Sequence, residues 1–120
     1  MKDNDIEKNI KKILGKECYE KSLEYPKDKV HFQKKQLRDD TAYYFFSVEN
    51  KQFYWQDYDV LISNDFKDKI GFRCNCNAFY YNSKCPHIAA CFNYYGDNIF
   101  NTSKEDFTKE ISNMLCHLLV

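Results

Sequence analysis

Residues 74–87 read CNCNAFYYNSKCPH and place three cysteines and one histidine in two close pairs. Cys74 and Cys76 fall where a strand is expected to end, and Cys85 and His87 bracket a proline where a helix is expected to start. A tetrahedral zinc ion holds each donor atom about 2.0–2.3 Å away, so its ligands usually come as close pairs from two local structures. The spacing therefore predicts one zinc ion that joins the strand to the helix.

Three other interpretations of this cluster stay open. The cysteines could be small buried side chains and the histidine a hydrogen-bonded core residue. A disulfide between Cys74 and Cys76 would close a very small, strained ring. A thiol enzyme would use Cys85 or Cys76 as nucleophile and His87 as base, which leaves two further thiols unexplained. Cys91, one helical turn after His87, is a spare ligand or, more simply, a core residue.

The residues before the cluster favour an antiparallel sheet. Four segments rich in aromatic and β-branched residues are separated by short polar turns: VHFQKKQL (30–37), TAYYFFSV (41–48), QFYWQDYDVLI (52–62) and KIGFRC (69–74). Parallel strands would need crossovers of a dozen or more residues, so the short connections predict a meander over residues 29–73. The run YYFFSV does not alternate, which predicts that the second strand is covered on both faces.

Helices are expected before and after the strands. The N-terminal segment 1–25 has apolar residues at helical spacing, namely Ile6, Ile10, Ile13 and Leu14. Gly15 follows them as a helix stop. The run HIAACFNYY continues as a helix to Gly96, and a last helix over 102–119 follows. Its apolar stripe consists of Phe107, Ile111, Met114, Leu115 and Leu118. The fold class is therefore α+β, in a single domain over residues 1–120.

The composition narrows the class of protein. The 120 residues include 18 basic and 18 acidic side chains, so the overall positive field of many nucleic-acid-binding proteins is missing. Neither an apolar run of membrane-spanning length nor the apolar core of a secretory signal is found, which predicts a cytoplasmic protein without a membrane partner. In a reducing compartment, close cysteines favour a metal over a disulfide framework.

The pattern Cys-x-Cys, eight residues, Cys-x-His, followed by the apolar helix IAACF, resembles the SWIM zinc finger over about residues 70–96. The resemblance implies a strand-turn-helix module in which Cys74, Cys76, Cys85 and His87 bind one structural zinc ion. SWIM modules occur in bacterial Swi/Snf-type helicase-like ATPases, in Mutator-type transposases and in some ubiquitin-pathway and signalling proteins. Their implied partners are DNA or protein.

The segment before the finger is also similar to the N-terminal part of bacterial Swi/Snf-type proteins. CYEKSLEYP (18–26) stands where that family often has a tyrosine-containing segment. This likeness implies an accessory domain of a helicase-like protein, whose ATPase this chain does not encode, since it contains no GxxxxGK[ST] loop. A freestanding zinc scaffold is the alternative.

Basic and aromatic side chains near the cluster are candidates for contact with a partner. They are Lys67, Lys69, Arg73, Tyr80, Tyr81 and Lys84. The cations suit phosphates and the tyrosines suit stacking on bases. However, three thiolates on one Zn²⁺ leave a charge of minus one, so the cations can equally offset the site. Four protein ligands leave no open position on zinc, so we expect a non-catalytic module without a small-molecule substrate.

Overall fold

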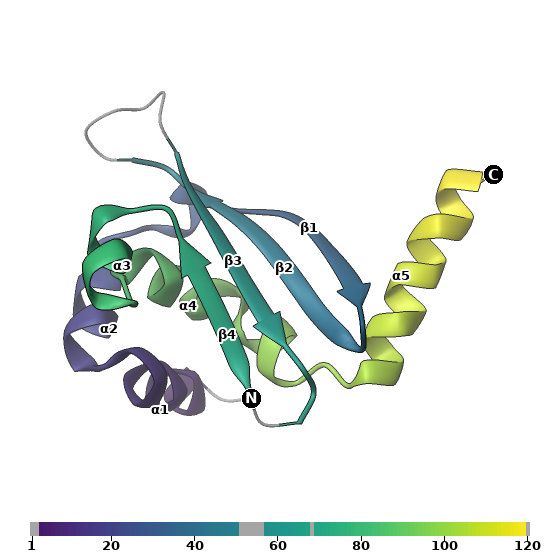
Figure 1. The fold of residues 1–120 in the computed structure, drawn as a ribbon, viewed down its shortest axis with the longest axis horizontal. Coiled ribbons are helices and arrows are strands. Elements are labelled where there is room, and N and C mark those ends of the chain that lie inside the picture. The colour runs from purple at the N-terminus through teal and green to yellow at the C-terminus, as the bar shows by residue number, and fades with distance from the viewer. Residues whose placement is uncertain (1–2, 51–56, 68, 120) are drawn as a thin grey trace.

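A computed structural model describes residues 3–50, 57–67 and 69–119, with side chains for 5–50, 57–67 and 69–112. Over these ranges the chain is α+β with a four-stranded antiparallel sheet (Figure 1), which confirms the expected fold class. The elements are α1 (Asp3–Leu14), α2 (Lys16–Ser22), a 3-10 turn (Lys27–Lys29), β1 (Val30–Arg38), β2 (Thr41–Val48), β3 (Tyr58–Asn64), β4 (Ile70–Cys74), α3 (Asn77–Asn82), α4 (Pro86–Phe100) and α5 (Lys104–Leu119). Within the same ranges, every helix is too short or too polar for a transmembrane span.

The strands form a meander in the order β1-β2-β3-β4, each antiparallel to the next. Asp39 and Asp40 join β1 to β2 with φ angles of 52° and 65°, the left-handed backbone of a two-residue hairpin turn. β3 begins at Tyr58, and residues 52–56 of the strand expected over 52–62 lie outside the described residues. Short polar turns thus give antiparallel pairing, as the sequence predicts.

A bulge interrupts β1. The register against β2 shifts between Phe32 and Lys34, so that Gln33 is an extra residue on the edge strand. Because of this shift, Phe32 and Lys35 both lie on the face that bears the core, although they are three residues apart, and Lys34 lies on the opposite face. The bulge therefore changes which side chains of β1 reach each face.

The hydrophobic core lies between the inner face of the sheet and α4. From the sheet it contains Val30, Ala42, Tyr44, Phe46, Val48, Val60 and Ile62. From the helices it contains Ile6, Ile10, Leu14, Ile88, Ala89, Ala90, Cys91, Phe92, Ile99 and Phe107. Full burial of one large apolar side chain stabilises the folded chain by roughly 1.5–3 kcal/mol. α4 packs on the strands, and α1 and α2 pack on α4, so α4 connects the helices to the sheet (Figure 1).

The outer face of the sheet has no described helix across it (Figure 1). Tyr43 and Phe45 belong to this face, because side chains alternate along a strand and their neighbours Tyr44 and Phe46 are buried in the core on the other face. Both rings are only half-buried, so the expectation that the second strand is covered on both faces is wrong. Aromatic side chains on an open face are shielded by neighbours on adjacent strands, which is why the run lacks a polar alternation.

α5 begins against the sheet, and its later turns extend away from it (Figure 1). Phe107 is fully buried, and its ring centroid lies 5.6 Å from that of Tyr44. Lys35 on β1 forms an ion pair with Glu110. The first turns of α5 therefore close one end of the core. The expected stripe continues through Met114, Leu115 and Leu118, whose side chains lie outside the described residues.

Candidate metal centre

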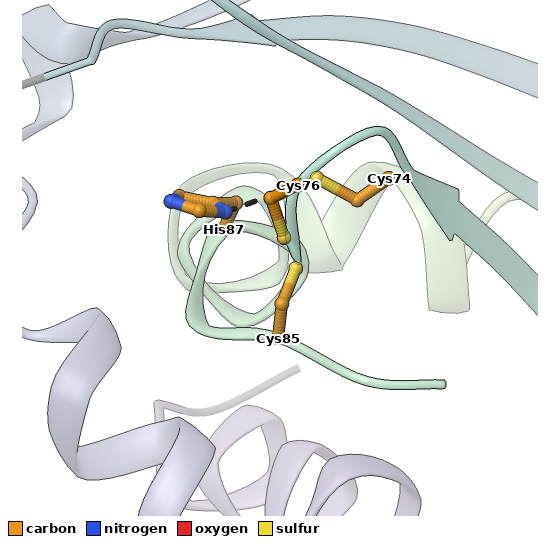
Figure 2. A group of neighbouring side chains, drawn as sticks. All are labelled: Cys74, Cys76, Cys85 and His87. Atoms are coloured by element: carbon orange, nitrogen blue, oxygen red, sulfur yellow. Dashed lines mark hydrogen bonds between the residues drawn. The ribbon is translucent and has the colours of Figure 1, made fainter. Parts of the chain in front are cut away.

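The four predicted ligands come together at one end of the sheet (Figure 2). Cys74 is the last residue of β4, Cys76 is the N-cap of α3, Cys85 is the N-cap of α4, and His87 lies in the first turn of α4. All four side chains are buried, and their candidate ligand atoms lie within 4.8 Å of one another. The structure therefore places a possible metal-binding cluster where the sequence predicts one.

The first pair is held by the backbone beyond β4. Asn75 N donates to the carbonyl of Asp59 at 3.3 Å, and the Asn75 side-chain oxygen accepts from Asp59 N at 3.0 Å. These two bonds extend the β3–β4 pairing by one residue beyond Cys74. The chain turns immediately afterwards, so that Cys74 and Cys76 both face the cluster.

The residues between the two pairs form a short helix, which the sequence pattern did not predict. α3 occupies 77–82, and the Cys76 sulfur accepts a hydrogen bond from Phe79 N at 3.4 Å, as an N-cap side chain does. Ser83, with a left-handed φ of 59°, ends the helix. This short helix reverses the chain, so that the Cys85 sulfur lies close to the sulfurs of Cys74 and Cys76.

Hydrogen bonds and burial give the three thiols different proton affinities. The pKa of Cys74 is held below its usual value, first by a hydrogen bond from Cys85 and further by one from His87. The same bond, together with burial, raises the pKa of Cys85, and burial raises that of Cys76. Cys74 is therefore the sulfur that accepts hydrogen bonds from its neighbours, and a bound cation would take the place of those protons.

The donor set fits zinc. Donor atoms around a tetrahedral zinc ion lie about 3.3–3.8 Å apart. Cys74 Sγ and His87 Nδ1 are 3.8 Å apart, and no pair in the cluster exceeds 4.8 Å, so small side-chain movements complete the geometry. Thiolates with an imidazole suit Zn²⁺ and do not suit Mg²⁺ or Ca²⁺, which prefer oxygen. Four protein donors fill the coordination sphere, which is typical of structural sites.

His87 is oriented by two tyrosines that the sequence analysis did not select. Nδ1 faces Cys74, while Nε2 lies 3.0 Å from the hydroxyl oxygen of Tyr25. If Nδ1 binds a metal, Nε2 carries the proton and donates to Tyr25. The ring of Tyr58 stacks on the imidazole, with centroids 4.1 Å apart and an interplanar angle of 24°. Both contacts fix the direction of Nδ1.

These two tyrosines are themselves held in place. The Tyr94 hydroxyl on α4 donates to the Tyr25 carbonyl at 2.5 Å, and the Asn50 side-chain amide donates to the Tyr58 hydroxyl at 3.1 Å. The signal that could have found Tyr25 is the segment CYEKSLEYP, which ends at this tyrosine and its proline. Nothing in the local sequence of Tyr58 distinguishes it from the neighbouring aromatic residues.

We expect Tyr25→Phe to weaken zinc binding by about 10-fold, because second partners that orient a metal-bound histidine typically contribute 10- to 100-fold in affinity. The change keeps the ring against His87 and removes only the hydroxyl. Competition with a chromophoric zinc chelator measures the affinity. Tyr19→Phe is the matched control, because Tyr19 lies in the same segment on α2 and has no described contact with His87. Equal affinities for Tyr25→Phe and the wild type would contradict the role.

Cys91 lies outside the cluster. It is fully buried in α4 one turn after His87, and burial raises its thiol pKa well above the usual value. Among the residues whose side chains are described, the cysteines are all free thiols, Cys74 and Cys76 included. The structure thus places Cys91 in the core.

The six contact candidates do not share one surface. Tyr80 and Tyr81 are 80% and 78% exposed on α3, beside the cluster. Lys84 follows α3, and its ammonium reaches toward Gly15. Arg73 is exposed on the outer face of β4. The remaining two, Lys67 and Lys69, are exposed in the turn before β4, at the far end of that strand from the cluster.

No protein-family model, curated protein or solved structure matches this chain. The SWIM likeness is therefore a likeness of ligand spacing. The case for a metal rests on the four buried side chains and on the groups that orient them.

Proposed function

We propose that the chain is a non-catalytic zinc-binding module in which one Zn²⁺ joins β4 to α4. The observation that carries the proposal is the convergence of four buried sulfur and nitrogen donors within 4.8 Å of one another. A core made for apolar packing gains little from gathering three thiols and an imidazole, whereas a structural zinc site needs this set. Metal binding and folding would then be coupled.

The pKa values of the thiols favour this function over a thiol enzyme. An enzyme of that kind would use Cys85 or Cys76 as nucleophile, and a nucleophilic cysteine needs a lowered pKa and access to solvent. Both thiols have raised pKa values, and both side chains are buried. Cys74, whose pKa is lowered, is only 5% exposed. The cluster therefore lacks an accessible activated sulfur.

The module would act by presenting its surfaces to DNA or protein. The SWIM spacing supports a place as an accessory part of a Swi/Snf-type helicase-like protein, with a freestanding zinc scaffold as the other candidate. In either setting the zinc ion would fix the end of β4 and the start of α4, and the partner would contact residues outside the coordination sphere.

Metal analysis combined with thiol alkylation tests the proposal. Protein purified under reducing conditions is expected to hold about one zinc ion per chain, because the cluster offers one complete tetrahedral donor set. Mass spectrometry should find Cys74, Cys76 and Cys85 alkylated only after a chelator is added. Cys18, half-buried on α2 and outside the cluster, is the internal control and should react without the chelator. Well under one equivalent of metal, or immediate alkylation of Cys85, would contradict the proposal.

A further inference from the structure

Two cross-strand rows occupy the middle of the outer face of the sheet. Register partners from β1 to β4 align in the first row as Lys34, Phe45, Leu61 and Arg73, and in the second row as Gln36, Tyr43, Ser63 and Gly71. We call these eight residues the central rows. Each row crosses all the strands, so the face presents a continuous surface, and no described helix crosses it (Figure 1).

The rings in the central rows are spaced like successive bases. Tyr43 and Phe45 are two residues apart on β2, which separates them by about 7 Å along the strand. That distance suits neighbouring nucleotides of an extended single strand, each of which can stack on one ring. The second row has small side chains on the β3 and β4 side of Tyr43. A Cβ atom on Gly71 would lie 2.6 Å from Ser63 Oγ, so only glycine fits there without displacing that side chain. The surface next to the Tyr43 ring therefore leaves space for a base to stack on that ring.

The charges of the central rows suit phosphates. Lys34 and Arg73 end the first row on the two edge strands, Arg38 lies one row further on the same face, and neither row contains an acid. The chain has only two arginines, and this face carries both of them. The Lys34 ammonium lies 4.8 Å from the centroid of the Phe45 ring. A base that stacked there would displace the ammonium toward the adjoining phosphate.

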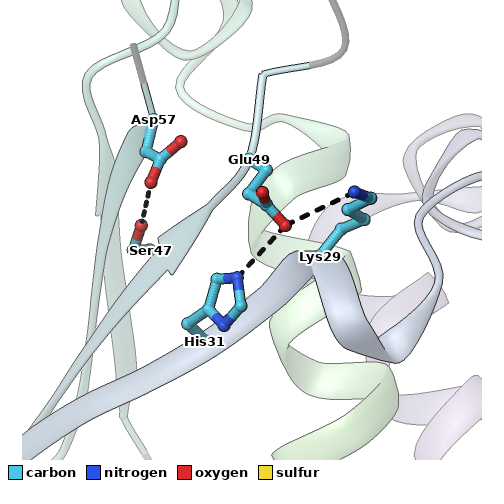
Figure 3. Close-up of polar contacts among 5 residues, drawn as sticks. All are labelled: Lys29, His31, Ser47, Glu49 and Asp57. Atoms are coloured by element: carbon cyan, nitrogen blue, oxygen red, sulfur yellow. Dashed lines mark hydrogen bonds and ion pairs between the residues drawn. The ribbon is translucent and has the colours of Figure 1, made fainter. Parts of the chain in front are cut away.

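Of the acids near the end of this face, Glu49 and Asp57 contact other side chains (Figure 3), and Asp59 is exposed in the row next to Leu61. Glu49 accepts from His31 at 3.2 Å and pairs with Lys29 at 3.7 Å, and Asp57 accepts from the Ser47 hydroxyl at 3.2 Å. Lys29 offsets the charge of Glu49, while the Ser47 hydroxyl leaves the charge of Asp57 in place. The central rows themselves contain no acid, and Asp59 faces their positive charge from the neighbouring row.

A hollow of about 430 Å³ lies beside the first row, and its lining includes Gln33, Phe45, Leu61, Arg73, Asn75 and one exposed acid, Asp59. It reaches from the edge strand β1 to the edge strand β4 and adjoins the Phe45 ring. A duplex keeps its bases stacked inside, so its bases cannot reach the two rings. A protein partner of ordinary interface size would need more apolar surface than one tyrosine, one phenylalanine and one leucine provide.

We propose that the outer face of the sheet binds single-stranded nucleic acid. Two successive bases stack on Tyr43 and Phe45, and phosphates contact Lys34, Arg38 and Arg73. The inference names the partner of the proposed zinc module, and it rests on that function in one respect: Arg73 is adjacent to Cys74, so zinc at the cluster fixes the β4 edge of the binding face.

Fluorescence anisotropy with labelled oligonucleotides of about 12 residues tests the site, since single-strand sites cover about 4–16 nucleotides. The wild-type zinc-loaded chain should bind oligo(dT) or oligo(U) at low salt and should bind a duplex of the same length more weakly. The double variant Tyr43→Leu, Phe45→Leu should bind about 10- to 100-fold more weakly, because stacking is lost and apolar bulk is kept. Arg73→Gln should flatten the slope of log affinity against log salt by about 0.7.

Two variants serve as matched controls. Tyr80→Leu, Tyr81→Leu removes two exposed rings from α3, and Lys8→Gln removes one exposed cation from α1; neither should change the affinity more than about 2-fold. A loss of affinity confined to the Tyr80→Leu, Tyr81→Leu variant would overturn the inference, because the contact would then lie on α3. Equal affinity for the duplex would overturn it as well. No binding to any nucleic acid at low salt would also overturn it.

Zinc content, measured on every variant, separates this inference from the proposed function. A full equivalent of zinc without single-strand binding would overturn the inference alone. Single-strand binding that depends on Tyr43 and Phe45 in a chain without zinc would overturn the proposed function alone. Circular dichroism of the double variant shows whether its fold is kept. If that variant unfolds, Tyr43→Leu alone, on the half-buried ring beside Gly71, carries the test with an expected loss of about 5- to 10-fold.

Discussion

Removal of zinc by a chelator should lower the free energy of unfolding by about 5 kcal/mol or more, because structural zinc sites contribute about 10–16 kcal/mol in small zinc-dependent domains. Whole domains of this size are stable by only about 5–15 kcal/mol. Without the ion, three thiols and His87 stay buried without a common ligand, and the link between β4 and α4 is lost. Urea unfolding followed by far-ultraviolet circular dichroism, with zinc and with chelator, measures the difference.

A ligand variant should reproduce the effect of the chelator. Cys85→Ser removes one donor from the N-cap of α4 and should unfold at the urea concentration of the zinc-free wild type. Cys18→Ser is the control, because this half-buried thiol lies on α2 outside the cluster, and its change should cost less than about 1 kcal/mol. If Cys85→Ser and the zinc-loaded wild type unfold together, the metal does not stabilise the fold.

Truncation of Phe92 is expected to lower the free energy of unfolding by about 3–5 kcal/mol, the usual cost of Phe→Ala in a core. Phe92 is fully buried on α4, and its ring stacks on that of Phe100 with centroids 5.1 Å apart and an interplanar angle of 13°. Phe92→Ala therefore leaves a cavity between α4 and its neighbours. The same urea titration, performed with zinc present, measures the change.

This second effect should be independent of the metal. Phe92→Ala should retain a full equivalent of zinc, because the residue lies more than one helical turn beyond His87 and is not one of the four ligands. Tyr81→Ala is the matched aromatic control: the side chain is 78% exposed, so its loss should cost about 0.5 kcal/mol or less. A Phe92→Ala variant as stable as Tyr81→Ala would mean that α4 is held by the metal alone.

The fold class could be predicted because its determinants are local. The polar turn at Asp39 and Asp40 is too short for anything except a hairpin, and the connections from β2 to β3 and from β3 to β4 are also shorter than a parallel crossover needs. The ligand spacing is local as well. Cys74 with Cys76 and Cys85 with His87 are each two residues apart, so only the meeting of the two pairs depends on tertiary structure.

The features that sequence reasoning missed are tertiary. Tyr25 reaches His87 across 62 positions of the chain, and no local pattern encodes that contact. The bulge at Gln33 reflects the pairing of β1 with β2 and leaves the composition of the strand unchanged. α3 was missed because a segment of six residues with two adjacent tyrosines has no helical periodicity; its start depends on the capping sulfur of Cys76.

α3 contributes no buried residue to the core, although it lies between two pairs of metal ligands. The segment 77–83 is therefore held at its ends, at Cys76 and Cys85, and by half-buried Phe79, whose ring centroid lies 6.4 Å from that of Phe72. Substitution of its exposed residues should cost little stability, and this exposed part can be replaced without remaking the sheet. For the engineer it is the place to graft a peptide epitope or an optical reporter, displayed on a rigid base.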